Sequence, residues 1–95
     1  MARRRSHRAD GNQPEIVKAL RPVGIEVHII DEPVDLLCGW RGVWTLLEVK
    51  DKDGRGLQLT PAQQDFFENP KGPALVVLNV EEAINAVLHG QLAWP

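Results

Sequence analysis

The spacing of hydrophobic and polar residues changes along the chain, and each change predicts a new helix or strand. Ile16, Ala19, Leu20 and Val23 recur at helical spacing. Three later stretches are rich in β-branched residues and partly alternate, which is typical of strands, and a fourth is continuously apolar, which indicates an interior strand. The predicted elements are helices over residues 12–22, 60–68 and 79–88 and strands over residues 25–30, 34–39, 43–50 and 74–78.

Two of the predicted helices begin with a capping signal. Asn12 precedes Pro14, with Glu15 three residues after the cap. Thr60 is likewise followed by Pro61, with Gln63 at the third position. A polar cap followed by proline and then by Glu or Gln is the signature of a capping box. Helical geometry places Glu15 at the edge of the apolar stripe, so it is either a capping carboxylate or a side chain directed towards a site.

The order of these elements is α-β-β-β-α-β-α, which predicts an α/β fold of the α+β kind. An antiparallel meander followed by a helical crossover gives a mixed sheet with helices packed on it. The chain has 95 residues, 43% of them hydrophobic and 25% charged, which suits one globular domain. We expect an arm over residues 1–11 and a single domain over residues 12–95.

Composition also bears on the compartment. The single cysteine, Cys38, cannot form an internal disulfide and is expected to be a buried strand residue. No apolar run approaches the length of a membrane helix, and no apolar segment follows the N-terminal arginines as a signal peptide would require. These features predict a cytoplasmic protein with no membrane partner.

The formal net charge of −2 hides an asymmetry. Residues 1–22 contain 6 basic and 2 acidic side chains, a net charge of +4, whereas the remainder has 5 basic and 11 acidic side chains, a net charge of −6. A basic arm on an acidic body is either a solvated terminus or an arm that reaches a polyanion. The arm residues that we nominate for phosphate binding are Arg3, Arg4, Arg5 and Arg8.

The strand over residues 43–50 carries the candidate chemistry. Alternate residues share a face of a strand, so Glu48 and Lys50 lie on the same side. If Arg41 and Gly42 form a two-residue turn, Asp35 lies directly opposite Glu48, whereas a three-residue loop would place the two carboxylates on opposite faces.

Two facing carboxylates on half-buried strands repel each other unless one is protonated or a cation lies between them. Oxygen ligands on a rigid sheet suit Mg²⁺, with Mn²⁺ as a substitute. Lys50 would then stabilise charge on a phosphate or support the attacking water. The other interpretation is that Lys50 only neutralises Asp35 or Glu48 at a strand end.

Four segments together resemble the PD-(D/E)xK nuclease superfamily. They are residues 12–17, 33–39, 46–50 and 59–63, and the resemblance extends over residues 12–88. The chain is most similar to the small virus-type replication-repair nuclease (VRR-NUC) branch, to which phage and archaeal Holliday-junction resolvases are structurally related. It departs from the superfamily pattern at Val34, where the superfamily has proline before the motif aspartate.

This resemblance implies a restriction-endonuclease-like αβββαβ core with a C-terminal helix, and it implies roles for individual residues. Asp35 and Glu48 match the metal-binding acids, and Lys50 matches the catalytic lysine. Glu15 matches the acidic residue of the first helix that helps hold the metal, and Gln63 matches a glutamine that supports the active site. The Val49 carbonyl is a further candidate metal ligand.

Other residues have two interpretations each. A lone histidine in a strand is more often a core or rim residue than a metal ligand, so we expect that role for His28. Trp40 and Trp44 flank the predicted turn, and they either pack the core or form an exposed surface for DNA or a second subunit. Four basic residues in predicted loops are either candidate phosphate contacts or solvated surface residues: Arg41, Lys52, Arg55 and Lys71.

We therefore expect a Mg²⁺-dependent DNA endonuclease. The resemblance implies structure-selective cutting of branched DNA such as Holliday junctions, and it suggests a phage or prophage source and the cytoplasm of a bacterial or phage-infected cell. Symmetrical cutting of two strands calls for a C2 homodimer. The alternative is a non-catalytic DNA-binding or assembly module that retains the nuclease fold.

Overall fold

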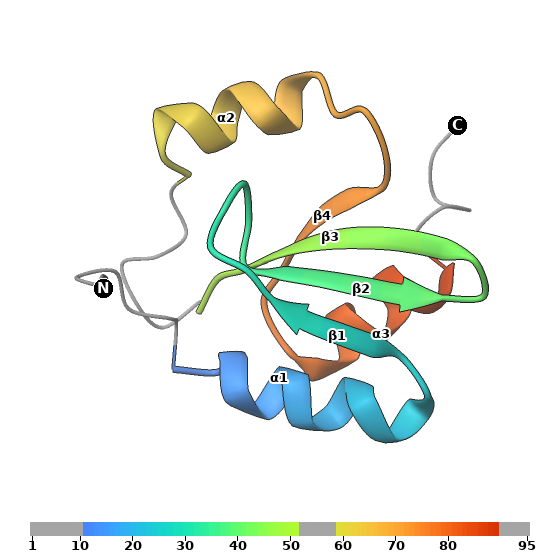
Figure 1. The fold of residues 1–95 in the computed structure, drawn as a ribbon. Coiled ribbons are helices and arrows are strands. Elements are labelled where there is room, and N and C mark those ends of the chain that lie inside the picture. Colours follow the sequence, from blue (N-terminus) through green and yellow to red (C-terminus); the bar gives the residue numbers. More distant parts are fainter. Residues whose placement is uncertain (1–10, 52–58, 90–95) are drawn as a thin grey trace.

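The computed structural model describes residues 11–51 and 59–89. These residues form a four-stranded mixed sheet with helices on both sides (Figure 1). The strand order is β1-β2-β3-β4, with antiparallel β1–β2 and β2–β3 pairs and a parallel β3–β4 pair. The elements are α1 (Gln13–Leu20), a 3₁₀ turn (Arg21–Val23), β1 (Glu26–Ile29), β2 (Leu36–Trp40), β3 (Val43–Val49), α2 (Pro61–Glu68), β4 (Ala74–Val77) and α3 (Val80–His89).

This element order confirms the predicted α/β class with its mixed sheet and final helix. The parallel β3–β4 pair requires a crossover, which α2 provides on the side of the sheet away from α1 and α3 (Figure 1). Strand boundaries differ slightly from the prediction, since β2 begins at Leu36 rather than at residue 34. There the Asp35 carbonyl accepts the Ile30 amide at 2.8 Å, so residues 30–35 form a closed loop instead of a longer strand.

The two-residue β2–β3 turn is confirmed, and the three-residue loop is excluded. Trp40 pairs with Val43, and the register continues to Leu36 opposite Leu47. Arg41 and Gly42 have φ angles of 53° and 82°. Two consecutive positive φ angles match a type I′ turn, whose twist suits a two-residue hairpin. The local turn geometry therefore sets the register of the two strands that carry Asp35 and Glu48.

The hydrophobic core lies between the sheet and the pair α1 and α3. Helix α1 supplies Ile16, Val17 and Leu20, and α3 supplies Ala83 and Val87. The sheet residues of this core are Val27, Leu36, Cys38, Leu47, Val49 and Val77. The opposite face of the sheet, on the side of α2, therefore does not contribute to this core.

Cys38 lies in this core with no exposed surface. Burial raises the pKa of its thiol to about 12, because the apolar surroundings disfavour the thiolate. The thiol therefore stays protonated near neutral pH, which agrees with the interpretation of Cys38 as a packing residue.

The expected capping box at Asn12 is wrong, whereas the one at Thr60 is confirmed. Asn12 has helical backbone angles and makes no side-chain capping bond. Thr60 accepts the Gln63 amide at 3.1 Å, and the Gln63 side chain accepts the Thr60 amide at 3.2 Å. The same sequence signature forms a capping box at Thr60 but not at Asn12, because the Asn12 side chain instead donates to backbone carbonyls that are distant in the sequence.

No helix among residues 11–51 and 59–89 is long and apolar enough to cross a membrane.

Candidate metal and phosphate site

The candidate site lies on the face of the sheet opposite α1 and α3. Thr45, Leu47 and Val49 of β3 are buried on the core side. Strand alternation directs Glu48 to the other face, as predicted. Glu48 is nevertheless only 3% exposed, so its carboxylate is held in a largely dry environment.

Asp35 enters the site just before β2 begins. The confirmed register, extended by one pair beyond Leu36 and Leu47, brings Asp35 opposite Glu48, which is the one of the two predicted placements that a two-residue turn requires. Its Oδ2 accepts the Val49 amide at 2.8 Å, and the residue is buried. The Asp35 carboxylate is therefore anchored to β3 by a charge-assisted hydrogen bond beside Glu48.

Glu48 and Lys50 form a buried ion pair. Their Oε2 and Nζ atoms are 3.1 Å apart, and the side chains are 4% and 12% exposed. The structure thus contains the charge neutralisation that sequence reasoning offered as one role of Lys50. The other oxygen, Oε1 of Glu48, is buried and has no hydrogen-bond partner in the structure. An unpartnered carboxylate oxygen in a dry site is costly, and a cation would satisfy it.

The donor set available here fits Mg²⁺. This ion commonly takes one or two carboxylates and retains several waters, so Asp35 and Glu48 are sufficient protein ligands. No group of three or more His, Cys, Asp or Glu side chains suited to hold a metal occurs in the described part of the chain. A third acidic ligand is therefore not supplied there, and the Val49 carbonyl stays a prediction.

The structure does not bring Glu15 to the other two acids. The buried face of α1 consists of Gln13, Ile16, Val17 and Leu20, and Glu15 is exposed. The prediction that Glu15 borders the apolar stripe is therefore wrong, because the stripe begins at Gln13, almost opposite Glu15 on the helix. Its role in metal binding gains no support from this placement.

Asn12 is a residue of the site that sequence reasoning missed. Its Nδ2 donates to the Leu78 carbonyl at 2.8 Å and approaches the Lys50 carbonyl at 3.4 Å. Its Oδ1 is buried without a partner, as is Oε1 of the adjacent Gln13. Asn12 thus ties the start of α1 to the ends of β3 and β4, next to Lys50. An asparagine before a helix is a common cap, so nothing local in the sequence signalled this tether.

Replacing Asn12 with aspartate distinguishes the tether from a cap. Asp is as good a cap as Asn, but it cannot donate to the Leu78 carbonyl. We expect N12D to lower the free energy of unfolding by roughly 1–3 kcal/mol in urea titration. The matched control is Asn79→Asp, because the Asn79 Oδ1 does cap α3 by accepting the Glu82 amide at 2.8 Å. Equal stabilities of the two variants would contradict the tether.

Gln63 belongs to the capping box of α2, where both of its bonds to Thr60 are made. Its contribution to catalysis stays a prediction. Helix α2 itself lies above the face that carries Glu48, as the ribbon shows (Figure 1).

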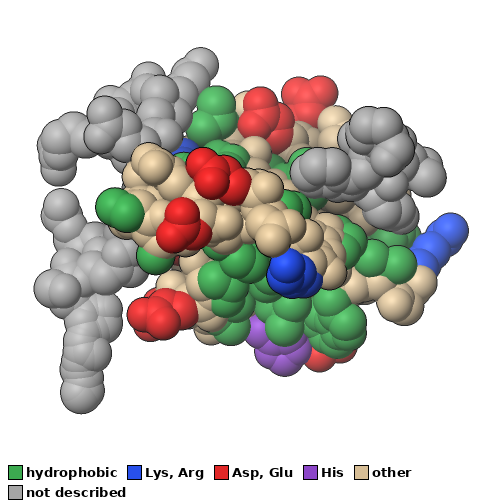
Figure 2. All heavy atoms as spheres, turned by 90° about the horizontal axis from the view of Figure 1, so that it is seen from above, with side chains coloured by type: hydrophobic (Ala, Val, Ile, Leu, Met, Phe, Trp, Pro, Cys, Tyr) green, Lys and Arg blue, Asp and Glu red, His purple; other side chains and the backbone are tan. Residues whose placement is uncertain are grey.

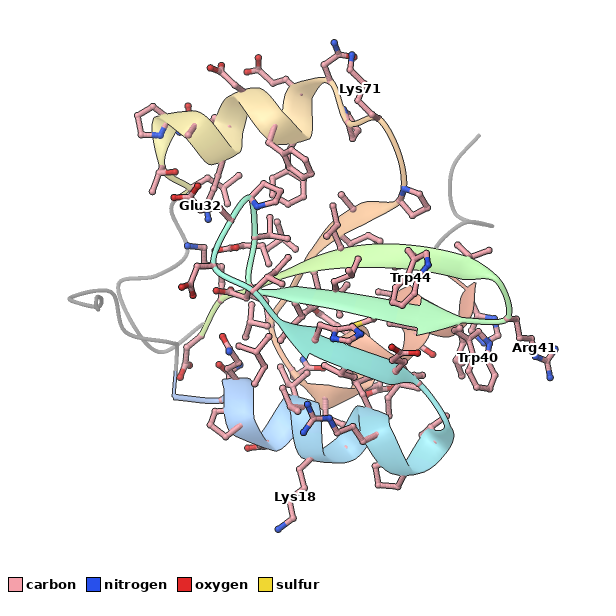
Figure 3. All side chains as sticks on the ribbon, viewed as in Figure 1. Lys18, Glu32, Trp40, Arg41, Trp44 and Lys71 are labelled. Atoms are coloured by element: carbon pink, nitrogen blue, oxygen red, sulfur yellow. The ribbon has the colours of Figure 1, made fainter. Side chains whose placement is uncertain are left out.

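The candidate DNA-binding residues are only partly placed. Arg41 is exposed at the end of the β2–β3 hairpin, with its guanidinium 5.2 Å from the centre of the Trp40 ring (Figure 3). Lys71 is exposed after α2 (Figure 3). The remaining candidates lie outside the described residues: Arg3, Arg4, Arg5, Arg8, Lys52 and Arg55.

Comparisons with models of protein families, with curated proteins and with solved structures found no match for this chain.

Proposed function

We propose that the chain is a Mg²⁺-dependent endonuclease that hydrolyses phosphodiester bonds of DNA. The observation that carries this proposal is the buried Glu48, which has one unpartnered oxygen and lies beside Asp35 and Lys50. The resemblance of these three residues and their flanking segments to the PD-(D/E)xK superfamily gives the reaction class.

Each residue has a definite task in this proposal. Asp35 and Glu48 would hold the ion, which supplies Lewis-acid activation of water and of the phosphate. The Val49 amide fixes the Asp35 carboxylate, so its orientation is set before substrate arrives. The Lys50 ammonium is 3.1 Å from Glu48, and in this proposal it would leave that carboxylate for a phosphate oxygen and stabilise the charge that grows on it.

Substrate and assembly form the finer part of the proposal. A single domain over residues 12–95 offers little surface for reading bases, which favours recognition of DNA structure over sequence. We propose branched DNA such as a four-way junction as substrate, a C2 homodimer for paired cuts, and the cytoplasm as the location. A strict monomer by light scattering at micromolar concentration would contradict the dimer.

Cleavage of a labelled four-way junction, a duplex and a single strand tests the function. We expect cutting with Mg²⁺ or Mn²⁺ and none with EDTA. Cutting in EDTA would overturn the metal-dependent mechanism. A folded protein that binds the junction but cuts none of the three substrates with either ion would overturn the endonuclease and leave the non-catalytic DNA-binding module.

A further inference from the structure

The hairpin end of the sheet carries an exposed aromatic surface on the same face as Glu48. Trp44 is 47% exposed although it lies within a central strand. The side of the molecule that bears α2 also shows hydrophobic side chains gathered next to a histidine (Figure 2). An exposed tryptophan ring that adjoins a histidine ring and a hollow forms part of a contiguous exposed surface, and such surfaces mark binding sites.

Gly39 fixes the position of the Trp44 ring. A Cβ atom added to Gly39 would lie 2.7, 2.9 and 3.0 Å from three carbons of the six-membered ring. Only glycine leaves enough room for the ring to lie over the neighbouring strand in this way. The ring is therefore supported from below by β2 and needs no ordering when a ligand stacks on it.

His28 and Glu26 of β1 support the ring from the side. The His28 and Trp44 ring centres are 6.0 Å apart, with an interplanar angle of 43°. The His28 Nε2 is 2.7 Å from Oε2 of Glu26, so the two exposed side chains are in contact. The aromatic surface thus spans three adjacent strands.

A hollow of about 430 Å³ opens at this end of the sheet. Its lining includes Trp40, Trp44, Arg41 and Glu26. Trp44 lies on the α2 side of the sheet, and Trp40 and Arg41 lie at the end of the hairpin (Figure 3). Trp40 packs against the core on the other face of the sheet, under the Arg41 guanidinium, so Trp44 supplies the exposed ring. One aromatic face with a cation and a carboxylate nearby suits a flat, polar-edged ring attached to a phosphate chain, and a nucleobase has that chemistry.

We infer that this hollow, named here the hairpin hollow, stacks an unpaired nucleobase of the DNA substrate on Trp44. The inference rests on the proposed function. Trp44 and Glu48 are four residues apart on one strand, hence about 13 Å apart along it. That span equals about four nucleotides of a stacked strand. The scissile phosphate would therefore lie a few nucleotides from an unpaired base, as it does where a duplex meets a single-stranded arm.

Binding to a partial duplex with a single-stranded arm tests the stacking without cleavage. The arm is made either of thymidines or of abasic nucleotides with the same phosphates, and affinity is measured by fluorescence anisotropy in Ca²⁺. We expect the full chain to prefer the thymidine arm about tenfold. Trp44→Leu should abolish this preference by weakening only the thymidine complex, and Trp44→Phe should retain part of it.

Equal affinity of the unaltered protein for the two arms would overturn the inference, and this comparison needs no variant that folds. If Trp44→Leu instead changes the sedimentation coefficient and leaves the preference intact, the occupant of the surface is a second copy of the chain, which also overturns it. Base preference without any cleavage would refute the endonuclease alone. Cleavage without base preference would refute the stacking alone.

Discussion

Replacing Glu48 with glutamine is expected to lower cleavage in Mg²⁺ at least about 100-fold, because several kcal/mol of transition-state stabilisation depend on the bound ion. Glutamine keeps the size of the side chain and one oxygen but loses the charge. The variant should also bind Mn²⁺ more weakly in calorimetric titration. Its fold should persist, because the glutamine amide oxygen can still accept a hydrogen bond from the Lys50 ammonium.

The matched control is Glu81→Gln, which removes the same charge from an exposed position on α3. It should cleave as fast as the unaltered protein. Full activity of Glu48→Gln would refute Glu48 as a metal ligand. Weak cleavage with unaltered Mn²⁺ affinity would instead show that Glu48 acts on the reaction without holding the ion.

Replacing Lys50 with methionine is expected to lower the free energy of unfolding by about 3–5 kcal/mol, because it leaves the Glu48 carboxylate buried without its partner. Methionine preserves most of the chain length and apolar volume. Urea titration near pH 7 measures the loss.

A double variant separates the buried charge from packing. Glu48→Leu together with Lys50→Met removes both charges and should be close to the unaltered protein in stability. Mg²⁺ should recover part of the loss in Lys50→Met, because an ion that binds only the folded chain stabilises it. A loss below about 1 kcal/mol would show that the pair behaves like a solvent-exposed one.

The central part of the site could be predicted because it depends on local geometry. The sequence allowed a two-residue or a three-residue turn at Arg41 and Gly42, the structure shows the two-residue turn, and strand alternation then fixes the faces of Asp35 and Glu48. No longer-range information is needed for that step. The same reasoning placed the helices and the crossover, since both follow from the spacing of apolar residues and from capping signals.

Prediction failed where a side chain has partners far away in the sequence. Asn12 has the residue type and position of a cap, yet it binds a carbonyl 66 residues later. The apolar pattern of α1 suggested a stripe centred on the aliphatic residues, whereas the buried stripe also includes the polar Gln13, which turns Glu15 towards solvent. Burial of a polar residue depends on the tertiary packing, which the local pattern does not contain.

The 66-residue span between Asn12 and Leu78 has a consequence for the order in which the protein is made. A ribosome completes Asp35, Glu48 and Lys50 well before it adds β4, which pairs with β3 at Val76 opposite Glu48. Contacts between distant segments are also the slow ones to form. The β2–β3 hairpin brings the charged residues together locally, but β4 and the Asn12 tether enclose them only when both ends of the domain have met, and an unfinished chain carries them without that enclosure.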